Sequence, residues 1–332
     1  MKAFVVERYG KDGLRVADVP EPEVGDGDVL VRVSAAGINP LDTKVRNGDL
    51  KRLVKYRTPF VLGHDVAGVV ARAGSAVHGF QVGDEVYARP RDLRIGTFAP
   101  YIAMDQDDVA VKPVTLTLHE AAAVPLVSLA AWQALVDRAH VQPGQKVLVH
   151  AGSGGLGSTV IQLAKHLGAT VATTARGENA ELVRSLGADV VVDYTKEDFA
   201  EVLSGYDVVL DSRGGENLEK SLTVLRPGGL AIGVASPPDP AFAKQLGAPK
   251  FMGAVMGLMS RKVRTKARKL GVSYSFLFME ANGAQLRELA SLYDAGHLRP
   301  VIDKAFPFEQ TLEALAYVEQ GRAKGKVVVT LD

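Results

Sequence analysis

The stretch Ala151-Gly152-Ser153-Gly154-Gly155-Leu156-Gly157 decides the fold class of this chain. Its glycines at 152, 154 and 157 fit the pattern G-x-G-x-x-G, which becomes specific where a strand precedes it and a helix follows. Here an apolar run at 147–150 precedes it and a helical pattern begins at Gly157. Such a turn presents a helix N-terminus to a pyrophosphate. It predicts a dinucleotide site, the alternative being a structural turn in a sheet without cofactor.

The segments around this turn alternate between strand and helix. The expected strands are 147–150, 170–174, 190–193, 208–211 and 230–234, and the expected helices are 157–167, 179–186, 196–203 and 216–225. The strands are continuous apolar runs, as in sheets buried on both faces. This alternation predicts a doubly wound parallel sheet of the Rossmann type, an α/β fold.

The first third of the chain has another character. Short valine-rich runs at 2–7, 29–34, 68–73 and 85–88 are separated by Gly and Pro, which predicts a small β-barrel. A helical stretch at 119–139 follows, with Pro125 expected to break it in two. After 271 the sequence predicts a strand at 274–279, helices at 285–295 and 311–319, and a last strand at 326–331.

Composition limits the functional classes. The chain has 332 residues, 47% of them hydrophobic, and a formal net charge of +1, so its bulk charge favours neither a nucleic-acid nor a membrane partner. It has no cysteine, which excludes disulfides and thiolate zinc sites. The N-terminus lacks the apolar core of a signal peptide, and the richest apolar segment, 251–259, is too short to span a bilayer. The cytoplasm is the expected location.

The end of the second strand of the sheet indicates which dinucleotide binds. NAD sites usually place a carboxylate there to hold the ribose hydroxyls. This chain instead has Arg176, whose guanidinium suits a 2′-phosphate, so NADPH is favoured. Glu178 lies close enough to take the NAD role, although an acid in the first turn of a helix also has a structural explanation.

Several motifs, taken together, match one family. They are Gly37-Ile38-Asn39-Pro40-Leu41-Asp42, Leu62-Gly63-His64-Asp65-Val66-Ala67-Gly68, Val82-Gly83-Asp84-Glu85-Val86, the glycine turn, Leu186-Gly187-Ala188-Asp189 and the ending Gly321-Arg322-Ala323-Lys324-Gly325-Lys326-Val327. With them the chain resembles, nearly from end to end, the zinc-independent medium-chain dehydrogenases/reductases: quinone oxidoreductases and alkenal/one (enone) reductases.

The resemblance implies a GroES-like β-barrel catalytic domain, 1–124 with 281–332, and a Rossmann cofactor domain, 125–280. It implies a cleft where the domains meet and hydride transfer from NADPH to a small hydrophobic quinone or α,β-unsaturated carbonyl. It also implies a homodimer that pairs through the strand 274–279. No nucleic-acid or membrane partner is expected.

One position departs from the zinc-dependent alcohol dehydrogenases, which hold a catalytic zinc through Cys, His and Cys. Asn39 stands where the first Cys would be, and His64 keeps the His position with Asp65 beside it. One His and one Asp are too few for a convincing zinc site, so no metal is expected. The resemblance gives Asn39 a contact with the nicotinamide ribose.

Catalysis without zinc needs another source of charge stabilisation and a proton for the enolate. Lys44 is the first candidate, because resembling reductases often carry Lys or Tyr at this position; a solvent-facing lysine is the alternative. Tyr56 is weaker, since the basic residues around it make its loop look exposed. Solvent is a further proton source.

The resemblance supplies the remaining site residues. It assigns cofactor contacts to the turn, to positions at strand ends and to the entering helix: Gly152, Ser153, Gly154, Gly155, Leu156, Gly157, Ser128, Arg176, Tyr194, Ala235, Ser236 and Lys326, besides Asn39. Trp132, also on that helix, is expected to be core.

The segment 251–269 stays open. Met252, Met256 and Met259 would share one helical face, as a lid over an apolar substrate, a packing face or a dimer contact. The basic run 261–269 is most often a solvated face. The segment could also hold an acyl carrier, which would make the protein an enoyl-thioester reductase. Two further hypotheses are a non-catalytic NADPH- or RNA-binding protein and an alcohol dehydrogenase that uses His64.

Overall fold

The computed structural model describes residues 1–51 and 53–331. Their internal contacts divide the chain into two compact units, Met1–Leu129 with Glu280–Asp332, and Ala130–Met279. The first division falls five residues after the boundary expected at 124/125, and Glu280 lies with the first unit. The two units are described separately below.

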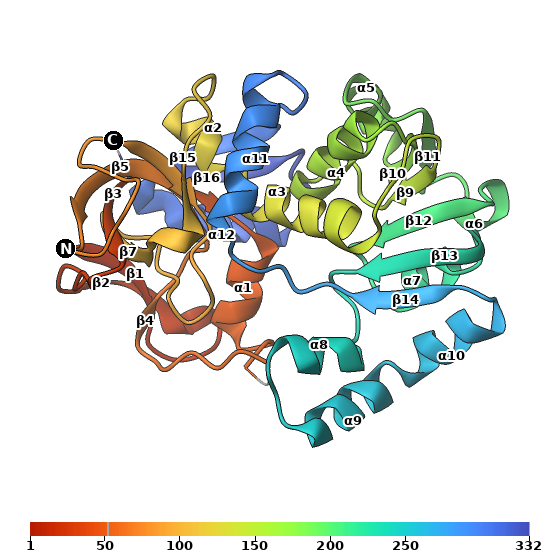
Figure 1. Ribbon diagram of the computed structural model, residues 1–332, viewed down its shortest axis with the longest axis horizontal. Coiled ribbons are helices and arrows are strands. Elements are labelled where there is room, and N and C mark those ends of the chain that lie inside the picture. Colours follow the sequence, from red (N-terminus) through yellow and green to blue (C-terminus); the bar gives the residue numbers. More distant parts are fainter. Residues whose placement is uncertain (52, 332) are drawn as a thin grey trace. The chain divides into compact units, whose positions relative to one another are not determined.

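The second unit contains a six-stranded, wholly parallel sheet (Figure 1). Its strands are β9 (Lys146–Val149), β10 (Thr170–Ala175), β11 (Val190–Asp193), β12 (Tyr206–Asp211), β13 (Leu225–Gly233) and β14 (Ser273–Phe276). Their order, β11-β10-β9-β12-β13-β14, is the doubly wound order in which strand sequence reverses beside the first strand. This confirms the predicted Rossmann-like fold.

Apolar strands explain why this sheet is central. Val147, Leu148 and Val149 of β9 are fully buried, as a strand covered on both faces requires. The helices that follow the strands are α4 (Gly155–His166), α5 (Ala180–Ser185), α6 (Phe199–Val202) and α7 (Gly215–Ser221). The helix expected at 196–203 is only the single turn α6. Two aspartate side chains bind backbone amides in this segment, and such bonds compete with helical hydrogen bonds. Asp193 Oδ1 accepts from the Thr195 amide, and Asp198 Oδ1 accepts from the Ala200 amide.

The first unit is built on a seven-stranded sheet whose longest path runs β15-β16-β3-β5-β6-β8, with β7 also paired to β3. These strands are β3 (Asp28–Ile38), β5 (Asp65–Ala73), β6 (Glu85–Ala88), β7 (Tyr101–Asp105), β8 (Val109–Val111), β15 (Ile302–Pro307) and β16 (Lys326–Thr330). A smaller sheet holds β1 (Lys2–Val6), β2 (Leu14–Asp18) and β4 (Phe60–Val61). The C-terminal strands therefore complete a sheet begun by the N-terminal part, in agreement with the expected GroES-like barrel.

Helices of this unit surround the sheet. They are α1 (Pro40–Asn47), α2 (Leu118–Ala122), α11 (Gly283–Asp294) and α12 (Thr311–Glu319), with α3 (Pro125–Trp132) running across the division between units. Pro125 is the first residue of α3, so the break expected there is confirmed. A π-helical segment, 133–138, continues α3.

The segment before β14 is helical: α8 (Pro240–Gln245), α9 (Lys250–Met259) and α10 (Arg261–Lys269). Met252, Met256 and Met259 all lie in α9, as the helical spacing predicted, but their exposure differs: Met256 is buried at 1% exposure and Met259 is 55% exposed. Of the helices among the described residues, none is long and apolar enough to cross a membrane.

Candidate cofactor and active site

In the first unit, strand register brings three polar residues from distant parts of the chain to one end of the sheet. Gly37 of β3 pairs with Asp65, and Ile38 pairs with Val327 of β16. Asn39 follows β3, Asp65 begins β5 and Lys326 begins β16. The antiparallel arrangement therefore makes their side chains neighbours although they are as much as 287 positions apart.

These three side chains form a buried network. The Lys326 ammonium donates to Asn39 Oδ1 at 2.5 Å and to Asp65 Oδ2 at 3.0 Å, and Asn39 Nδ2 donates to the same Asp65 oxygen at 2.9 Å. Asp65 Oδ1 accepts from the Leu126 amide at 2.8 Å, which ties the network to the start of α3. All three residues are at most 5% exposed. Their partners fix the side chains of Asn39 and Lys326, two of the expected cofactor-contacting residues.

His64 lies next to this network. Its Nδ1 is 2.5 Å from Asp42 Oδ1, and the other Asp42 oxygen accepts from the Asn39 amide at 2.6 Å. His64 Nε2 is buried without a hydrogen-bond partner among the described residues.

A zinc ion does not fit this donor set. Asp65, the carboxylate beside His64, already binds the Lys326 ammonium. The sequence has no cysteine, and the described residues contain no cluster of three or more His, Cys, Asp or Glu side chains suited to a metal. A second cation at this carboxylate would have to displace the lysine.

Lys44 and Tyr56 have contrasting surroundings. Lys44 is half-buried on helix α1, not on a loop, and no hydrogen bond or ion pair joins its ammonium to another described residue. Tyr56 is 6% exposed, which corrects the expectation of an exposed loop. Its ring stacks on Phe60 and its hydroxyl lies 3.4 Å from Asp92 Oδ1. Burial raises the pKa of Tyr56, so its hydroxyl is a poor proton donor.

Ser128, expected to contact the cofactor, is fully buried on α3. Its hydroxyl is 2.9 Å from the hydroxyl of Tyr293 on α11. Burial raises the pKa of Tyr293 above its usual range. Trp132, expected to be core, lies at the end of α3.

In the second unit, the glycine turn has distinct requirements at its three glycines. A Cβ at Gly152 would lie 2.0 Å from Thr173 Oγ1, and one at Gly157 would lie 2.3 Å from the Ala151 carbonyl oxygen. At Gly154 the nearest atom would be 3.4 Å away. Gly152 and Gly157 are therefore demanded by packing of turn against sheet and helix, whereas Gly154 leaves open space at the N-terminus of α4.

That open space suits an anionic group. Gly154 is the N-cap of α4, whose first-turn N–H groups have no partners inside the helix. Ser153, Gly155 and Leu156 are half-buried, so the turn remains accessible. Asn179 Nδ2 donates to Ser153 Oγ at 3.2 Å and holds the turn from the side of β10. A pyrophosphate could approach here.

The carboxyl ends of β10 and β11 carry the residues that would distinguish the two dinucleotides. Arg176 is fully exposed, and its Nε donates to the Tyr194 hydroxyl at 3.0 Å. Thr195 and the Gly177 amide, with Lys196 nearby, hold the pKa of Asp193 below its usual range, so this carboxylate is already engaged. Glu178 is exposed beside Arg176. Arg176 and Glu178 therefore both stand exposed at this edge, and only the guanidinium of Arg176 would complement a 2′-phosphate.

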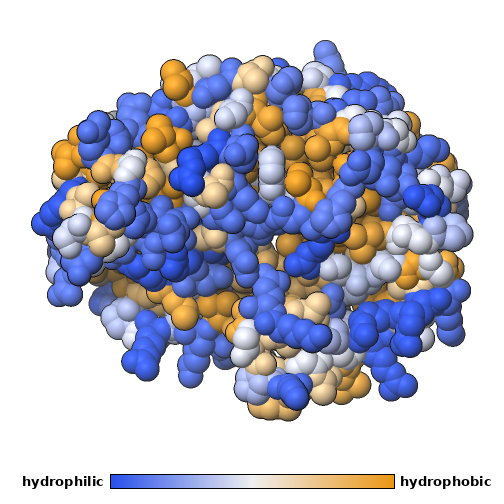
Figure 2. All heavy atoms as spheres, in the orientation of Figure 1, coloured by the Kyte–Doolittle hydropathy of each residue, from blue (hydrophilic) through white to orange (hydrophobic). Residues whose placement is uncertain are grey.

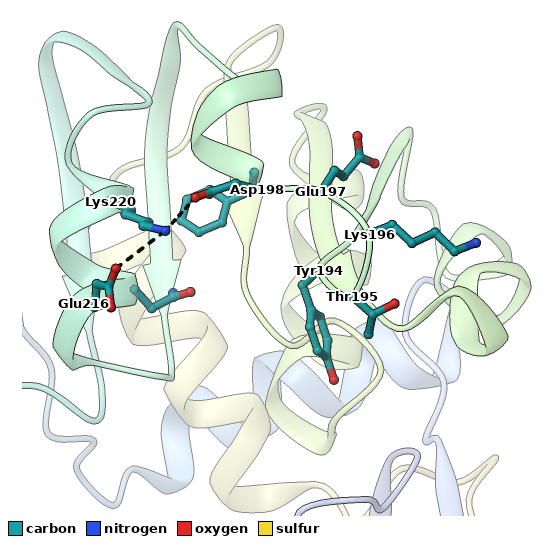
Figure 3. Close-up of a pocket in the computed structure, with 9 residues that line it drawn as sticks. Tyr194, Thr195, Lys196, Glu197, Asp198, Glu216 and Lys220 are labelled. Atoms are coloured by element: carbon teal, nitrogen blue, oxygen red, sulfur yellow. Dashed lines mark hydrogen bonds and ion pairs between the residues drawn. The ribbon is translucent and has the colours of Figure 1, made fainter.

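A pocket of about 470 Å³ adjoins Tyr194. It lies between the 194–199 segment and α7 (Figure 3). Lys220 spans two acids in it, with its ammonium 2.5 Å from Asp198 and 3.6 Å from Glu216. The hydrogen bond with Asp198 raises the pKa of Lys220, so it is fully charged but already paired. The polar lining of this pocket suits a nucleoside better than an apolar substrate.

Ala235 and Ser236 follow β13 and are half-buried. A Cβ at Gly214 would lie 2.5 Å from the Ala235 carbonyl oxygen, so the loop after β12 runs directly against this segment. Both positions are at the same carboxyl edge as the glycine turn, where doubly wound sheets bind ligands.

Sequence reasoning missed the partners of these residues. It noted Asp65 only as a neighbour of His64, and it gave no role to His150, a buried histidine at the end of the strand before the turn. The contact between Asn39 and Asp65 depends on the antiparallel pairing of Gly37 with Asp65, which the expected strands, 29–34 and 68–73, did not include.

Comparisons with known proteins agree with this architecture. Residues 25–114 match the family model described as "Alcohol dehydrogenase GroES-like domain", and residues 186–329 match "Zinc-binding dehydrogenase". The first range lies in the seven-stranded unit, and the second covers part of each unit.

Full-length relatives are also similar. The chain is 37% identical to "2-methylene-furan-3-one reductase" of Solanum lycopersicum and 37% identical to "NADPH-dependent alkenal/one oxidoreductase, chloroplastic" of Arabidopsis thaliana, each over 99% of this chain and 79% of the relative. Among solved structures, the quinone oxidoreductase from Coxiella burnetii superposes with a TM-score of 0.85 at 30% identity, covering 100% of this chain and 99% of that one.

Proposed function

The chain belongs to the medium-chain dehydrogenase/reductase family, and we propose that it is an NADP(H)-dependent reductase of quinones or of the conjugated double bond of α,β-unsaturated carbonyls that works without zinc. The chain is an enzyme of the oxidoreductase class, because its relatives are named NADPH-dependent alkenal/one oxidoreductase and quinone oxidoreductase.

Two observations support NADP(H) as the cofactor: an accessible glycine turn and an exposed cation at the end of the next strand. The turn at Gly154 leaves room for a pyrophosphate at a helix N-terminus, and Arg176 stands at the end of the next strand. A 2′-phosphate would gain charge-assisted hydrogen bonds from the guanidinium. NADP(H) supplies a hydride when bound.

The proposal of zinc independence rests on the Lys326–Asp65 ion pair and the lack of cysteine. Lys326 also provides a fixed positive charge at the end of β16, held by Asn39 and Asp65. We assign Lys326 and Asn39 to binding and orientation of the nicotinamide ribose. Dialysis against a chelator should leave activity unchanged.

A reduced enone needs a proton on its α-carbon after hydride reaches the β-carbon. Lys44 is our candidate donor, because the residue is half-buried and its ammonium has no partner among the described residues. Tyr56 is a weaker candidate, because its hydroxyl is packed against Asp92. Quinone reduction needs no positioned acid, and solvent would suffice.

The test is NADPH consumption with three substrates in parallel: a conjugated enone, the matching saturated ketone and a quinone. Consumption with the enone and not the ketone, with a saturated product, supports alkene reduction; Lys44→Ala should then lower kcat. Consumption with the quinone alone narrows the function to quinone reduction. No turnover with any of the three contradicts the proposal and favours an enoyl-thioester reductase or a non-catalytic protein.

We further propose a homodimer, with the cytoplasm as its compartment and no nucleic-acid partner. The dimer proposal rests on β14, which ends the six-stranded sheet and has one strand neighbour among the described residues. The compartment proposal rests on a chain that needs no disulfide to fold. Cell fractionation would test the compartment.

A further inference from the structure

Charge is distributed unevenly along this chain. Residues 240–279 contain eight basic and no acidic residues, although the whole chain has a formal net charge of +1. Six of the eight lie in the nine residues of α10. Of these six, Lys262 has an acidic partner, its ammonium being 2.5 Å from Glu219. The remaining charge on this segment is largely uncompensated.

The adjoining helix α9 exposes apolar side chains. Phe251 is 66% exposed, Val255 47%, Leu258 70% and Met259 55%. Their spacing of four, three and one residues places them on one face of the helix. Single exposed apolar residues are ordinary, but a continuous row of them marks a surface that is covered by something else.

Both helices are held to the unit by their opposite faces. Met256 is buried, and its carbonyl accepts from the Ser260 hydroxyl at 2.7 Å at the junction of the helices. Val263 and Ala267 of α10 belong to the core beneath the sheet. The outward apolar and basic side chains therefore sit on an anchored support, not on a loose segment.

We propose that this face docks on an anionic lipid surface. The docking face consists of Phe251, Val255, Leu258 and Met259 of α9 with the exposed cations Arg261, Arg268 and Lys269 of α10. Figure 1 shows α9 and α10 following one another along one edge of the parallel-sheet unit, and Figure 2 shows tan to orange side chains over α9 and blue ones over α10.

Charge selects among the possible occupants. A second copy docked symmetrically would set this basic segment against its own equivalent, which is repulsive. Anionic lipid complements the cations, and a helix with Phe and Leu on its apolar face can enter the boundary between headgroups and acyl chains without a matching groove. The expectation of no membrane partner used the net charge of the whole chain, and that sum hides the local positive charge of this segment. Lipid binding does not depend on the proposed reaction.

The experiment is flotation of the full-length protein with vesicles of phosphatidylcholine alone or with about 30 mol% phosphatidylserine, at about 0.1 M and 0.5 M salt. We expect binding to the anionic vesicles at low salt, roughly tenfold weaker binding at high salt, and little binding to neutral vesicles. Absence of binding to anionic vesicles at low salt overturns the proposal, whatever the variants do.

Two variants separate the contributions of the cations and of the apolar side chains to vesicle binding. Arg261→Glu with Arg268→Glu and Lys269→Glu should weaken binding at least about tenfold, because it replaces three cations at the anionic surface by three anions. Phe251→Ser with Leu258→Ser should weaken it several-fold. Each variant has a matched control that makes the same kind of change elsewhere on the surface. The charge control is Lys2→Glu with Arg184→Glu and Arg322→Glu, and the apolar control is Val82→Ser with Val114→Ser. Both controls should bind as the parent does, and all four variants change exposed residues.

The remaining outcomes point to a different occupant of the face. Equal loss in the controls would mean that binding follows net charge only, and would overturn the assignment to this face. If the α9 variant dissociates an oligomer, or raises KM for apolar substrates while vesicle binding is unchanged, the apolar row belongs to a copy interface or to the substrate site. Circular dichroism spectra and thermal unfolding verify that each variant folds.

Discussion

Arg176 tests cofactor choice at the scale of a single residue. We expect Arg176→Ala to weaken NADPH binding roughly thirtyfold and to leave NADH binding nearly unchanged, because only the 2′-phosphate of NADPH can accept a charge-assisted hydrogen bond from the guanidinium. Fluorescence titration with both cofactors measures this. Arg184→Ala, an exposed arginine on α5, is the control. An equal loss for both cofactors would show that Arg176 does not recognise the 2′-phosphate.

The buried pair of Lys326 and Asp65 predicts a large effect on stability. Lys326→Met leaves a fully buried carboxylate without its cation and should lower the free energy of unfolding by about 3–5 kcal/mol. Adding Asp65→Asn removes the stranded charge, so the double variant should be more stable than Lys326→Met alone. Urea unfolding of the parent and three variants completes the cycle. Additive losses would show that the two residues are not coupled.

His150 predicts a dependence of stability on pH. Its ring is buried between Thr174 and Ser221, and burial lowers its pKa to about 4 despite the nearby Asp211. The unfolded chain takes up a proton below about pH 6.5 while the folded chain does not, so protonation favours unfolding. This contribution to stability is complete above about pH 6.5, falls as the pH drops, and stops changing below about pH 4.

Unfolding of the parent and of His150→Gln at about pH 7 and pH 5 isolates that contribution. The parent should lose about 2 kcal/mol more than the variant over this interval. An equal loss in both proteins would mean that the native state takes up the proton at His150 at its ordinary pKa.

The glycine turn makes its prediction at the scale of an element. Gly152→Ala and Gly157→Ala each force a methyl group against the turn or strand, and should destabilise the protein by about 1–3 kcal/mol. Gly154→Ala brings its methyl group only to van der Waals contact, 3.4 Å from the Ala151 carbonyl oxygen, and should keep the melting temperature. The methyl group would stand where a pyrophosphate approaches, so NADPH affinity should fall. If Gly154→Ala binds NADPH as the parent does, the pyrophosphate is not at this turn.

Helices, strands and turns could be predicted where a short stretch of sequence determines them. The parallel sheet, the glycine turn and the Pro125 break follow from apolar runs and from the restrictions of Gly and Pro. The helix expected at 196–203 failed because Asp193 and Asp198 form side-chain caps that compete with helical hydrogen bonds. The Lys326–Asp65 contact could not be derived locally, because it depends on the pairing of three strands from opposite ends of the chain.

At the scale of the whole molecule, the edge strand of the parallel sheet, β14, predicts association. Its outward Phe276 amide donates to Asp239 Oδ2 at 3.0 Å, so the edge is left for another strand at Tyr274 and not along its whole length. β14 is paired to β13 on one side only among the described strands. Leu277 donates to Gly233 on that side, so by alternation the N–H of Tyr274 faces outward. Unprotected edges recruit another strand, and the two-fold dimers common among proteins pair identical edges.

We therefore expect light scattering to give twice the chain mass of 35.3 kDa at micromolar concentration. Tyr274→Pro removes the outward N–H and should shift the protein towards monomer, whereas Tyr274→Phe keeps that N–H and should stay dimeric. Because the Tyr274 hydroxyl donates to the Pro237 carbonyl at 2.7 Å, Tyr274→Phe also controls for the loss of that bond. A monomeric parent, or a folded Tyr274→Pro variant that remains fully dimeric, would exclude this edge as the interface.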